Sequence, residues 1–416
     1  MMFHSRTLFR QHSSKKLQEL GCIEVDGLPP CDLTNDIHTM YHLERFSNMT
    51  KEEYAVIRPA LQLASKFLTE DAMMDFWNHM YHGIYRIQTH MNGQELAKED
   101  RVPYIASGLK GKDPQTALQA TRQELLEMAN DIDIQFIGAD AHFGYGTKGY
   151  PLYGSSYFCR EDRDEALERF RQQAEMDSET DSEADSEEDS EEDSEEDSEA
   201  DSEEDSEMDR CLISVQEPRE KVSRGFMFLS YGFHFKIRAL LAGVSMTACA
   251  RTRFLLGFAI ILVHETAHLF CFRAQRRPYD DEPKWRFSEP ESYLELGYSW
   301  TVFAFGCMPM DDWACLAHSP LQKHCTWKDF AHATPRFFAA NDVFQKGGPR
   351  GHTGVAVPTA WVNAWFLEST WNDIDKKGRR KGRPSLKSAT IIDCVGDDDT
   401  QPDLMWTCRD VTLGEL

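Results

Sequence analysis

The sequence predicts an α+β fold that is mostly helical with a small sheet and is interrupted by a disordered acidic insertion. Three observations predict this class. Apolar residues recur with helical spacing in several segments, and short strand-like runs stand between them. One stretch, 177–209, contains 21 acidic and no basic residues, so most of the net charge of -25 belongs to it. The chain as a whole is 41% hydrophobic, which is enough for a sizeable core.

The expected elements follow in chain order. Thr50 and Glu53 have the spacing of a capping box, which predicts a helix through about Phe67, interrupted or kinked near Pro59. Two further helices are expected from helical periodicity. They cover 71–84 and 115–130. Strands are expected where β-branched and aromatic residues cluster. These runs are 132–137, 211–215 and 225–231.

Residues 264–268 read HETAH, one copy of the H-E-x-x-H pattern, directly after a run that is apolar on every side, as a buried helix would be. On a helix, His264 and His268 lie on one face and can hold one metal ion. Glu265 could then act as general base towards a water activated by Zn2+. Because a buried polar group costs about 1 to 3 kcal/mol unless it is satisfied, we favour a zinc site over two satisfied core histidines.

A catalytic zinc site usually has a third protein ligand. Ser288 and Glu291 have capping-box spacing, so a helix should begin there. Glu291 is then the capping partner, and Glu295, one turn further along, is the expected third ligand. Glu291 stays the alternative ligand, and an ordinary solvated helix start would explain both carboxylates. The intervening segment, 271–287, has the composition of a surface connection that lets the second helix fold back.

Other polar residues carry weaker hypotheses. Three side chains could stabilise the oxyanion of a tetrahedral intermediate. They are Tyr298, His318 and His352. Two further histidine pairs have ligand-like spacing, but neither has a glutamate after its first histidine or an apolar helix around it, and we expect surface helices instead. These pairs are His38 with His42 and His79 with His82.

The motif and its flanks resemble a family of filamentous-fungal proteins, largely without assigned activity, that has a zincin-like core. The resemblance spans roughly 54–371. It is carried by HETAH, by ELGYSW at 295–300, by IRPALQLASKFL at 57–68, and by VPTAW at 357–361 with Phe366 and Trp371. It implies a gluzincin-like site with His264, His268 and Glu295 as ligands and Glu265 as base. Thr301 and Cys307 depart from the family's pattern and leave residues beyond the ligands in doubt.

The acidic stretch repeats with a period of four and has no apolar surface, which predicts disorder. Segments that resemble the family lie on both sides of the acidic stretch. We therefore interpret the stretch as an insertion into one domain, with an interdomain linker as the alternative. The expected organisation is a disordered tail (1–35), two parts of the zincin-like domain (36–171 and 211–375) around the insertion (172–210), and a basic loop with a C-terminal tail (376–416). Serines at eight positions from Ser178 to Ser206 each precede an acidic residue by three, a pattern that suits an acidophilic kinase; a purely solubilising insertion is the alternative.

The run KKGRRKGR at 376–383 is the opposite charge feature. It is typical of a solvated loop, although it could serve nuclear localisation, contact nucleic acid or attract the acidic insertion. Eleven cysteines without metal-knuckle spacing indicate reduced thiols and an intracellular protein, cytoplasmic or nuclear. Four basic residues before Glu19 leave a mitochondrial presequence as an alternative. No run of about 20 apolar residues is present, so no membrane association is expected.

These patterns together predict a zinc-dependent hydrolase, with a peptide or protein as substrate. Two alternatives remain open. The chain could be a non-catalytic protein that keeps a metal for stability and binds partners through its acidic and basic tracts. It could also be a nuclear metallopeptidase that acts on chromatin-associated proteins.

Overall fold

The computed structural model describes residues 21, 25–87, 89–91, 94–95, 103–136, 154–157, 225–229, 231–244, 246–275, 296–306, 308–310, 338–340, 351–384, 389–395 and 405–411. Several expectations lie outside these residues. They are the acidic insertion with its serines, the strand at 211–215, and the side chains of Glu291, Glu295, Cys307 and His318.

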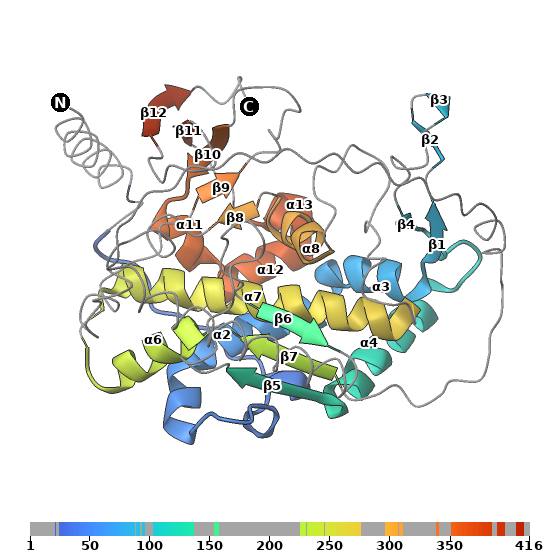
Figure 1. Cartoon of the computed structure of the whole chain (residues 1–416), viewed down its shortest axis with the longest axis horizontal. Helices are drawn as coiled ribbons and strands as arrows, with labels where there is room; N and C mark the ends of the chain where they lie inside the picture. Colours follow the sequence, from blue (N-terminus) through green and yellow to red (C-terminus); the bar gives the residue numbers. More distant parts are fainter. Residues whose placement is uncertain are drawn as a thin grey trace, which may run out of the picture.

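Helices make up most of the described chain (Figure 1). The α-helices are α2 (Lys51–Thr69), α3 (Met74–His82), α4 (Pro114–Asn130), α6 (Tyr231–Leu241), α7 (Ala248–Gln275), α8 (Leu296–Phe305), α11 (Thr359–Ala364), α12 (Glu368–Lys377) and α13 (Arg379–Gly382). Three short 3-10 helices are η1 (Thr39–Tyr41), η2 (Leu43–Arg45) and η3 (Asp71–Met73). Together with the sheets below, they confirm the mostly helical α+β class.

Helix α7 forms the centre of the core, where it contacts α2, α3, α8 and α11 (Figure 1). Its 28 residues extend the apolar run of the sequence in both directions. By length and composition alone, its segment Ala248–Ala274 could cross a membrane, but 78% of the apolar window is buried inside the chain. A buried core helix passes the same test, so the expected absence of a membrane stays a prediction.

Helix α2 begins as its capping box predicts. The Thr50 hydroxyl accepts from the Glu53 backbone N–H at 3.2 Å, and the Glu53 carboxylate accepts from the Thr50 N–H at 2.8 Å. Pro59 does not end the helix, which continues unbroken to Thr69. A proline inside a helix removes one backbone hydrogen bond, and the packing of α2 against α7 offsets that loss.

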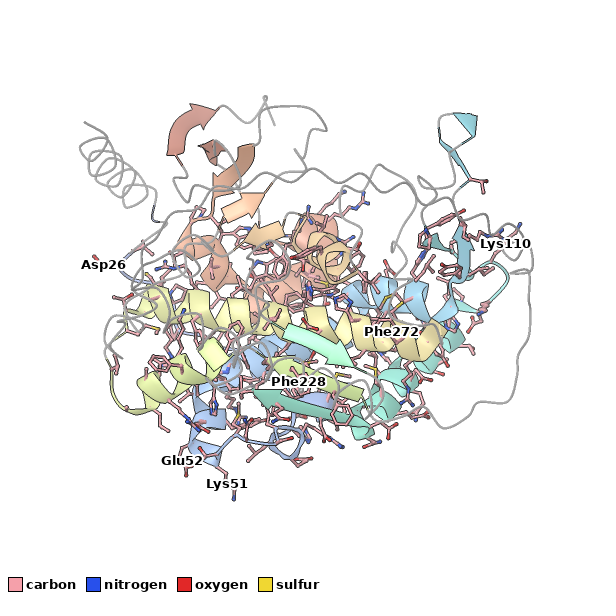
Figure 2. All side chains as sticks on the ribbon, in the orientation of Figure 1. Asp26, Lys51, Glu52, Lys110, Phe228 and Phe272 are labelled. Atoms are coloured by element: carbon pink, nitrogen blue, oxygen red, sulfur yellow. The ribbon has the colours of Figure 1, made fainter. Side chains whose placement is uncertain are left out.

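A three-stranded sheet packs beside α7 in the order β5 (Ile132–Phe136), β7 (Gly225–Leu229), β6 (Gly154–Tyr157). Strands β5 and β7 run parallel, whereas β6 pairs antiparallel to β7. All five residues of β7 are buried, including Phe228, which is labelled on this strand in Figure 2. Strands β5 and β7 confirm the two strand predictions that fall on described residues, with β7 ending two residues early because Tyr231 starts α6.

A second sheet has five antiparallel strands in the order β12-β11-β10-β9-β8. Its strands are β8 (Met308–Met310), β9 (Phe338–Ala340), β10 (Gly351–Ala356), β11 (Ala389–Val395) and β12 (Met405–Val411). The last two fall where the sequence predicts a C-terminal tail, so that segment contains a hairpin of paired strands. Two small sheets complete the fold: β1 (Ile84–Ile87) with β4 (Pro103–Ala106), and β2 (His90–Met91) with β3 (Gln94–Glu95).

The predicted N-terminal tail is wrong for residues 25–35, which dock on the late helices. The Asp32 N–H donates to the Phe366 carbonyl at 3.2 Å, and the Asp32 carboxylate accepts from the Glu368 N–H at 2.7 Å. Asn363 also donates to the Pro29 carbonyl at 3.0 Å. These backbone contacts carry no apolar pattern, which is why the composition of this segment resembles a tail.

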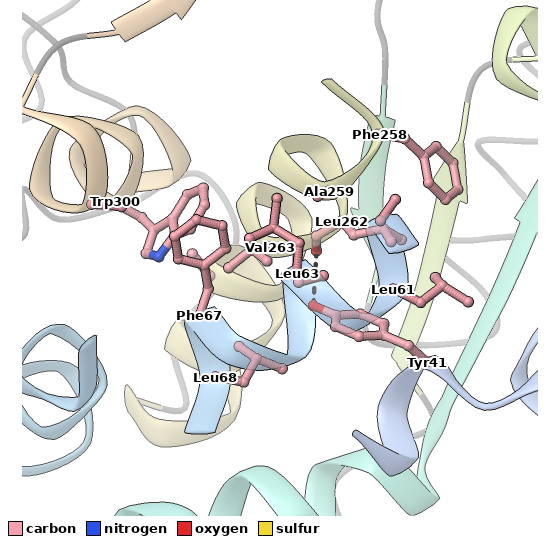
Figure 3. Packing of buried hydrophobic residues seen from close by; sticks show 14 of the residues in the cluster. Tyr41, Leu61, Leu63, Phe67, Leu68, Phe258, Ala259, Leu262, Val263 and Trp300 are labelled. Carbon is pink, nitrogen blue, oxygen red and sulfur yellow. Dashed lines mark hydrogen bonds between the residues drawn. The ribbon is translucent and has the colours of Figure 1, made fainter. Parts of the chain in front are cut away.

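An aromatic cluster joins α2, α8 and α12. Phe67 lies 5.3 Å from the ring centres of both Trp300 and Trp371, 5.4 Å from Phe305 and 5.7 Å from Trp365. Figure 3 shows Phe67 facing Trp300 beside the buried residues of α7. Aromatic pairs at these separations are worth about 0.5 to 1.5 kcal/mol each beyond their buried area. The cluster therefore holds α8 firmly against α2.

Candidate metal centre

The HETAH residues lie within α7, which continues for seven further residues and ends at Gln275. His268, the last residue of the motif, is buried. The neighbours Ala267, Leu269 and Phe270 are all buried, as the sequence predicts. The motif therefore sits on a rigid segment in the core. Its side chains have little freedom to leave the positions that α7 gives them.

The two histidines of the motif lie together on one face of α7. Their ring centres are 5.0 Å apart, with the ring planes at 60°. A ring nitrogen about 2.0 to 2.1 Å from zinc puts the ring centre about 3.2 Å from the metal, so two imidazoles on a tetrahedral ion have centres about 5 Å apart. The separation of His264 and His268 thus fits two ligands of one ion.

Burial differs along the motif. Glu265 is 3% exposed and His268 is 5% exposed, whereas His264 is partly exposed. The access to solvent at His264 marks the side from which a small molecule could approach. Glu265 lies in a region of low dielectric, where a carboxylate interacts strongly with a nearby cation.

The third motif residue, Thr266, faces away from the histidines and is anchored in the core. Its hydroxyl donates to the Leu262 carbonyl at 2.7 Å and lies 2.8 Å from the Tyr41 hydroxyl. Figure 3 shows Tyr41 reaching α7, with a dashed line to the Leu262 carbonyl. Burial raises the pKa of Tyr41 well above its usual value, so the phenol stays protonated. Tyr41 has no motif around it, so the sequence alone does not single it out.

Helix α8 packs on the histidine face at close range. A Cβ built on Gly297 would lie 2.5 Å from Cδ2 and Nδ1 of His264, closer than side-chain atoms approach one another. Only a glycine at this position lets α8 touch the imidazole. Tyr298, the next residue, packs edge-on against His264 with ring centres 5.2 Å apart. A glycine inside an apolar helical segment is the signal that could have predicted this close approach.

The structure brings one of the three oxyanion candidates to the motif. Tyr298 lies beside His264, whereas His318 is outside the described residues. His352 is in β10, where its backbone lies opposite Cys394 of β11. The expected third ligand, Glu295, and its alternative, Glu291, are also outside. Within the described residues, no group of three His, Cys, Asp or Glu side chains could hold a metal, so His264 and His268 form only part of a ligand set there.

By its order in the chain, 225–231 is the nearest predicted strand before the motif helix and hence the first candidate for aligning an extended substrate, but its pairing argues against that role. That segment forms β7, whose two edges are already paired with β5 and β6. Strand β6 is the better candidate, because among the described strands it pairs with β7 alone and it lies alongside α7. An exposed strand edge can bind an extended peptide through main-chain hydrogen bonds.

The other histidine pairs have partners in the backbone. Nε2 of His42 lies 3.0 Å from the Ile37 carbonyl oxygen, and Nε2 of His79 lies 2.8 Å from that of Ile105. Nδ1 of His38 accepts from the Met40 N–H at 3.3 Å, and burial lowers the pKa of His38 to about 4. Nε2 of His82 lies 3.0 Å from the Ala117 carbonyl oxygen, so each of the four rings contacts the backbone. The expected surface helix is wrong for the first pair, because His38 caps η1 and is buried.

The basic run at 376–383 is not the solvated loop that its composition predicts. Lys376 and Lys377 end α12, and α13 begins after a single residue, Gly378. Arg379 donates to the Phe303 carbonyl and places its guanidinium carbon 3.7 Å from the centre of the Phe303 ring. The guanidinium of Arg383 occupies the space where a side chain on Gly306 would lie. Arginine can stack its planar face on an aromatic ring, which a pattern of charges does not reveal.

The chain was compared with family models, curated proteins and solved structures, and none of them matches it. The resemblance noted from the sequence therefore stays an expectation. What the chain does must be inferred from its own residues and their geometry.

Proposed function

We propose that the chain is a zinc-dependent hydrolase of gluzincin type that cleaves peptide bonds. The observation that carries the proposal is the pairing of His264 and His268 on one face of α7, with ring centres at a distance compatible with one shared tetrahedral ion. Glu265 directly follows the first ligand on the same buried helix. Two histidines and a glutamate in this order are the ligand and base arrangement of H-E-x-x-H hydrolases.

Glu295 is the third ligand in this proposal. It directly precedes Leu296, the first residue of α8, and Gly297 of that helix touches His264. Consecutive Cα atoms are about 3.8 Å apart, so the Cα atom of Glu295 lies that close to the first residue of a helix that already contacts His264. Glu291, four residues earlier in the chain, stays the alternative ligand.

When bound, zinc would polarise the scissile carbonyl and make water a nucleophile near neutral pH. The residues of the chain supply the rest. Glu265 would accept the proton of the attacking water and return it to the leaving amine. Strand β6 would hold the substrate backbone in extended form, and Tyr298 would donate to the developing oxyanion. The buried surroundings of Glu265 would exclude bulk water from the proton transfer.

Metal content and cleavage, measured on the same purified samples, test the proposal. The variants are His268→Ala, Glu265→Gln and the control His42→Ala, which removes a partly exposed imidazole away from the motif. We expect about one zinc per chain in the wild type, retained in His42→Ala and in an inactive Glu265→Gln, and lost in His268→Ala. Wild-type protein without zinc would sink the metalloenzyme proposal.

Zinc binding without cleavage of a casein-type substrate would favour the non-catalytic alternative or a narrow substrate range. A parallel pair of variants, Glu295→Gln and Glu291→Gln, assigns the third ligand. We expect the first to weaken zinc binding by about 10-fold or more and the second to leave it unchanged. The reverse result would assign Glu291.

A further inference from the structure

The structure divides the basic run into two sets of side chains. Arg379 and Arg383 are partly buried against the C-terminal end of α8. The other four are exposed. They are Lys376, Lys377, Arg380 and Lys381. A run that is only solvated would not direct two of its arginines to one helix end.

Arg379 makes two different contacts with one residue of α8. Its guanidinium donates to the Phe303 carbonyl and also covers the Phe303 ring. The last carbonyls of a helix have no partner within the helix and carry partial negative charge, so a cation there is stabilising. Gly306, with φ at 75°, ends α8 in the left-handed conformation and leaves room for Arg383.

The opposite end of α8 touches the candidate metal centre. Gly297 lies so close to the His264 ring that a methyl group would not fit between them, and Tyr298 packs against the same ring. A helix of ten residues is about 15 Å long and nearly rigid, so a shift at its C-terminal end is felt at its start. The aromatic contacts of Trp300 and Phe305 press α8 onto α2. Arg379 adds a bond to the end of the helix, which resists sliding along its axis.

We propose that Arg379 is a positioning residue for the candidate metal centre, and that it acts by fixing α8 against His264. This inference rests on the proposed function, because Glu295 adjoins the start of α8. It gives the basic run a role within the fold. Arg379 itself does not touch the ligands.

The test compares Arg379→Ala, Arg379→Lys and the control Arg380→Ala, which changes the next residue of the same helix where the side chain is exposed. Zinc affinity is measured by competition with a chelator. The chemical shift of the His264 imidazole is measured by NMR in the metal-free proteins, assigned with His264→Gln. Circular dichroism checks that each variant is folded. If Arg379→Ala does not fold, the comparison is made with Arg379→Lys instead.

We expect Arg379→Ala to weaken zinc affinity about 10-fold and to shift the His264 resonance. Arg379→Lys should recover part of both, since it keeps the charge and loses the planar contact with Phe303. Arg380→Ala should match the wild type. Unchanged zinc affinity in Arg379→Ala, or equal loss in Arg380→Ala, would overturn the inference. If the wild type binds no zinc, the proposed function fails, and the His264 resonance alone decides whether Arg379 positions α8.

Discussion

The hydroxyl groups of Tyr41 and Thr266 lie 2.8 Å apart in the core, although the two residues are 225 positions apart in the chain. Thr266 is the middle residue of HETAH, and Tyr41 ends η1. The contact fixes the rotation of α7 from the face opposite the histidines. Helix α8 holds the histidine face itself, so the motif is fixed from two sides.

Replacing Tyr41 by Phe removes this contact without leaving a cavity. The Thr266 hydroxyl keeps its bond to the Leu262 carbonyl, so we expect a loss of about 1 kcal/mol in the free energy of unfolding, measured by urea denaturation. Thr266→Val and the double variant complete a thermodynamic cycle. A coupling energy of zero would show that the two hydroxyls do not stabilise each other.

The sign of the stability change in Gly297→Ala tests the contact between α8 and His264. In an ordinary helix this change would raise stability by about 0.5 to 1 kcal/mol, because alanine is the better helix former. Here the added methyl group collides with His264, so we expect lower stability and weaker zinc binding. Denaturation and chelator competition measure both, and a more stable variant with unchanged affinity would contradict the close contact.

His38 predicts a dependence of stability on pH. Burial, with a smaller contribution from His42, lowers its pKa to about 4 in the folded protein, whereas the unfolded chain titrates near the ordinary value of 6.5. The unfolded state therefore binds more protons between these pH values. Stability is complete above about pH 6.5 and falls as pH drops towards 4, by up to about 1.4 kcal/mol per unit.

The variant His38→Asn isolates this contribution. Asparagine can cap η1 but cannot be protonated, so the fall in unfolding free energy between pH 7 and pH 5 should become smaller. It should not vanish, because burial and Arg238 also lower the pKa of His234. An identical slope in the wild type and in His38→Asn, from urea denaturation at both pH values, would rule out His38 as a source.

Phe67→Leu tests the aromatic cluster that presses α8 onto α2. The change removes the ring that four other aromatic residues contact, and we expect a loss of about 2 kcal/mol in unfolding free energy. The control Leu126→Ala lies on the exposed face of α4 and should cost less than about 0.5 kcal/mol. Similar losses of unfolding free energy in both variants would show that the aromatic cluster does not stabilise the fold.

Local signals predicted the helices well. The capping box at Thr50 and the helical periodicity of 115–130 are properties of neighbouring residues in the chain. The helices they predict, α2 and α4, form as expected. The second sheet was not predicted, because its order depends on pairing between distant segments. Its β10 and β11, for example, are separated by three helices. No window of the sequence contains that information.

The candidate site divides in the same way. HETAH was predicted to lie on a buried helix with both histidines on one face, and the described geometry agrees. The contacts of Gly297 and Arg379 were not predicted. A glycine has no side chain to form a pattern, and a cluster of arginines has the same composition whether it is solvated or packed on a helix end.

The connection between β6 and β7 contains the whole acidic tract, from residue 158 to residue 224. The two strands pair antiparallel, and such strands can be joined by a short turn. Closure entropy rises slowly with loop length, by about 0.6 kcal/mol for each doubling of a flexible loop. We therefore expect that halving the acidic tract would change the free energy of unfolding by less than about 1 kcal/mol, so that β6 and β7 would still pair.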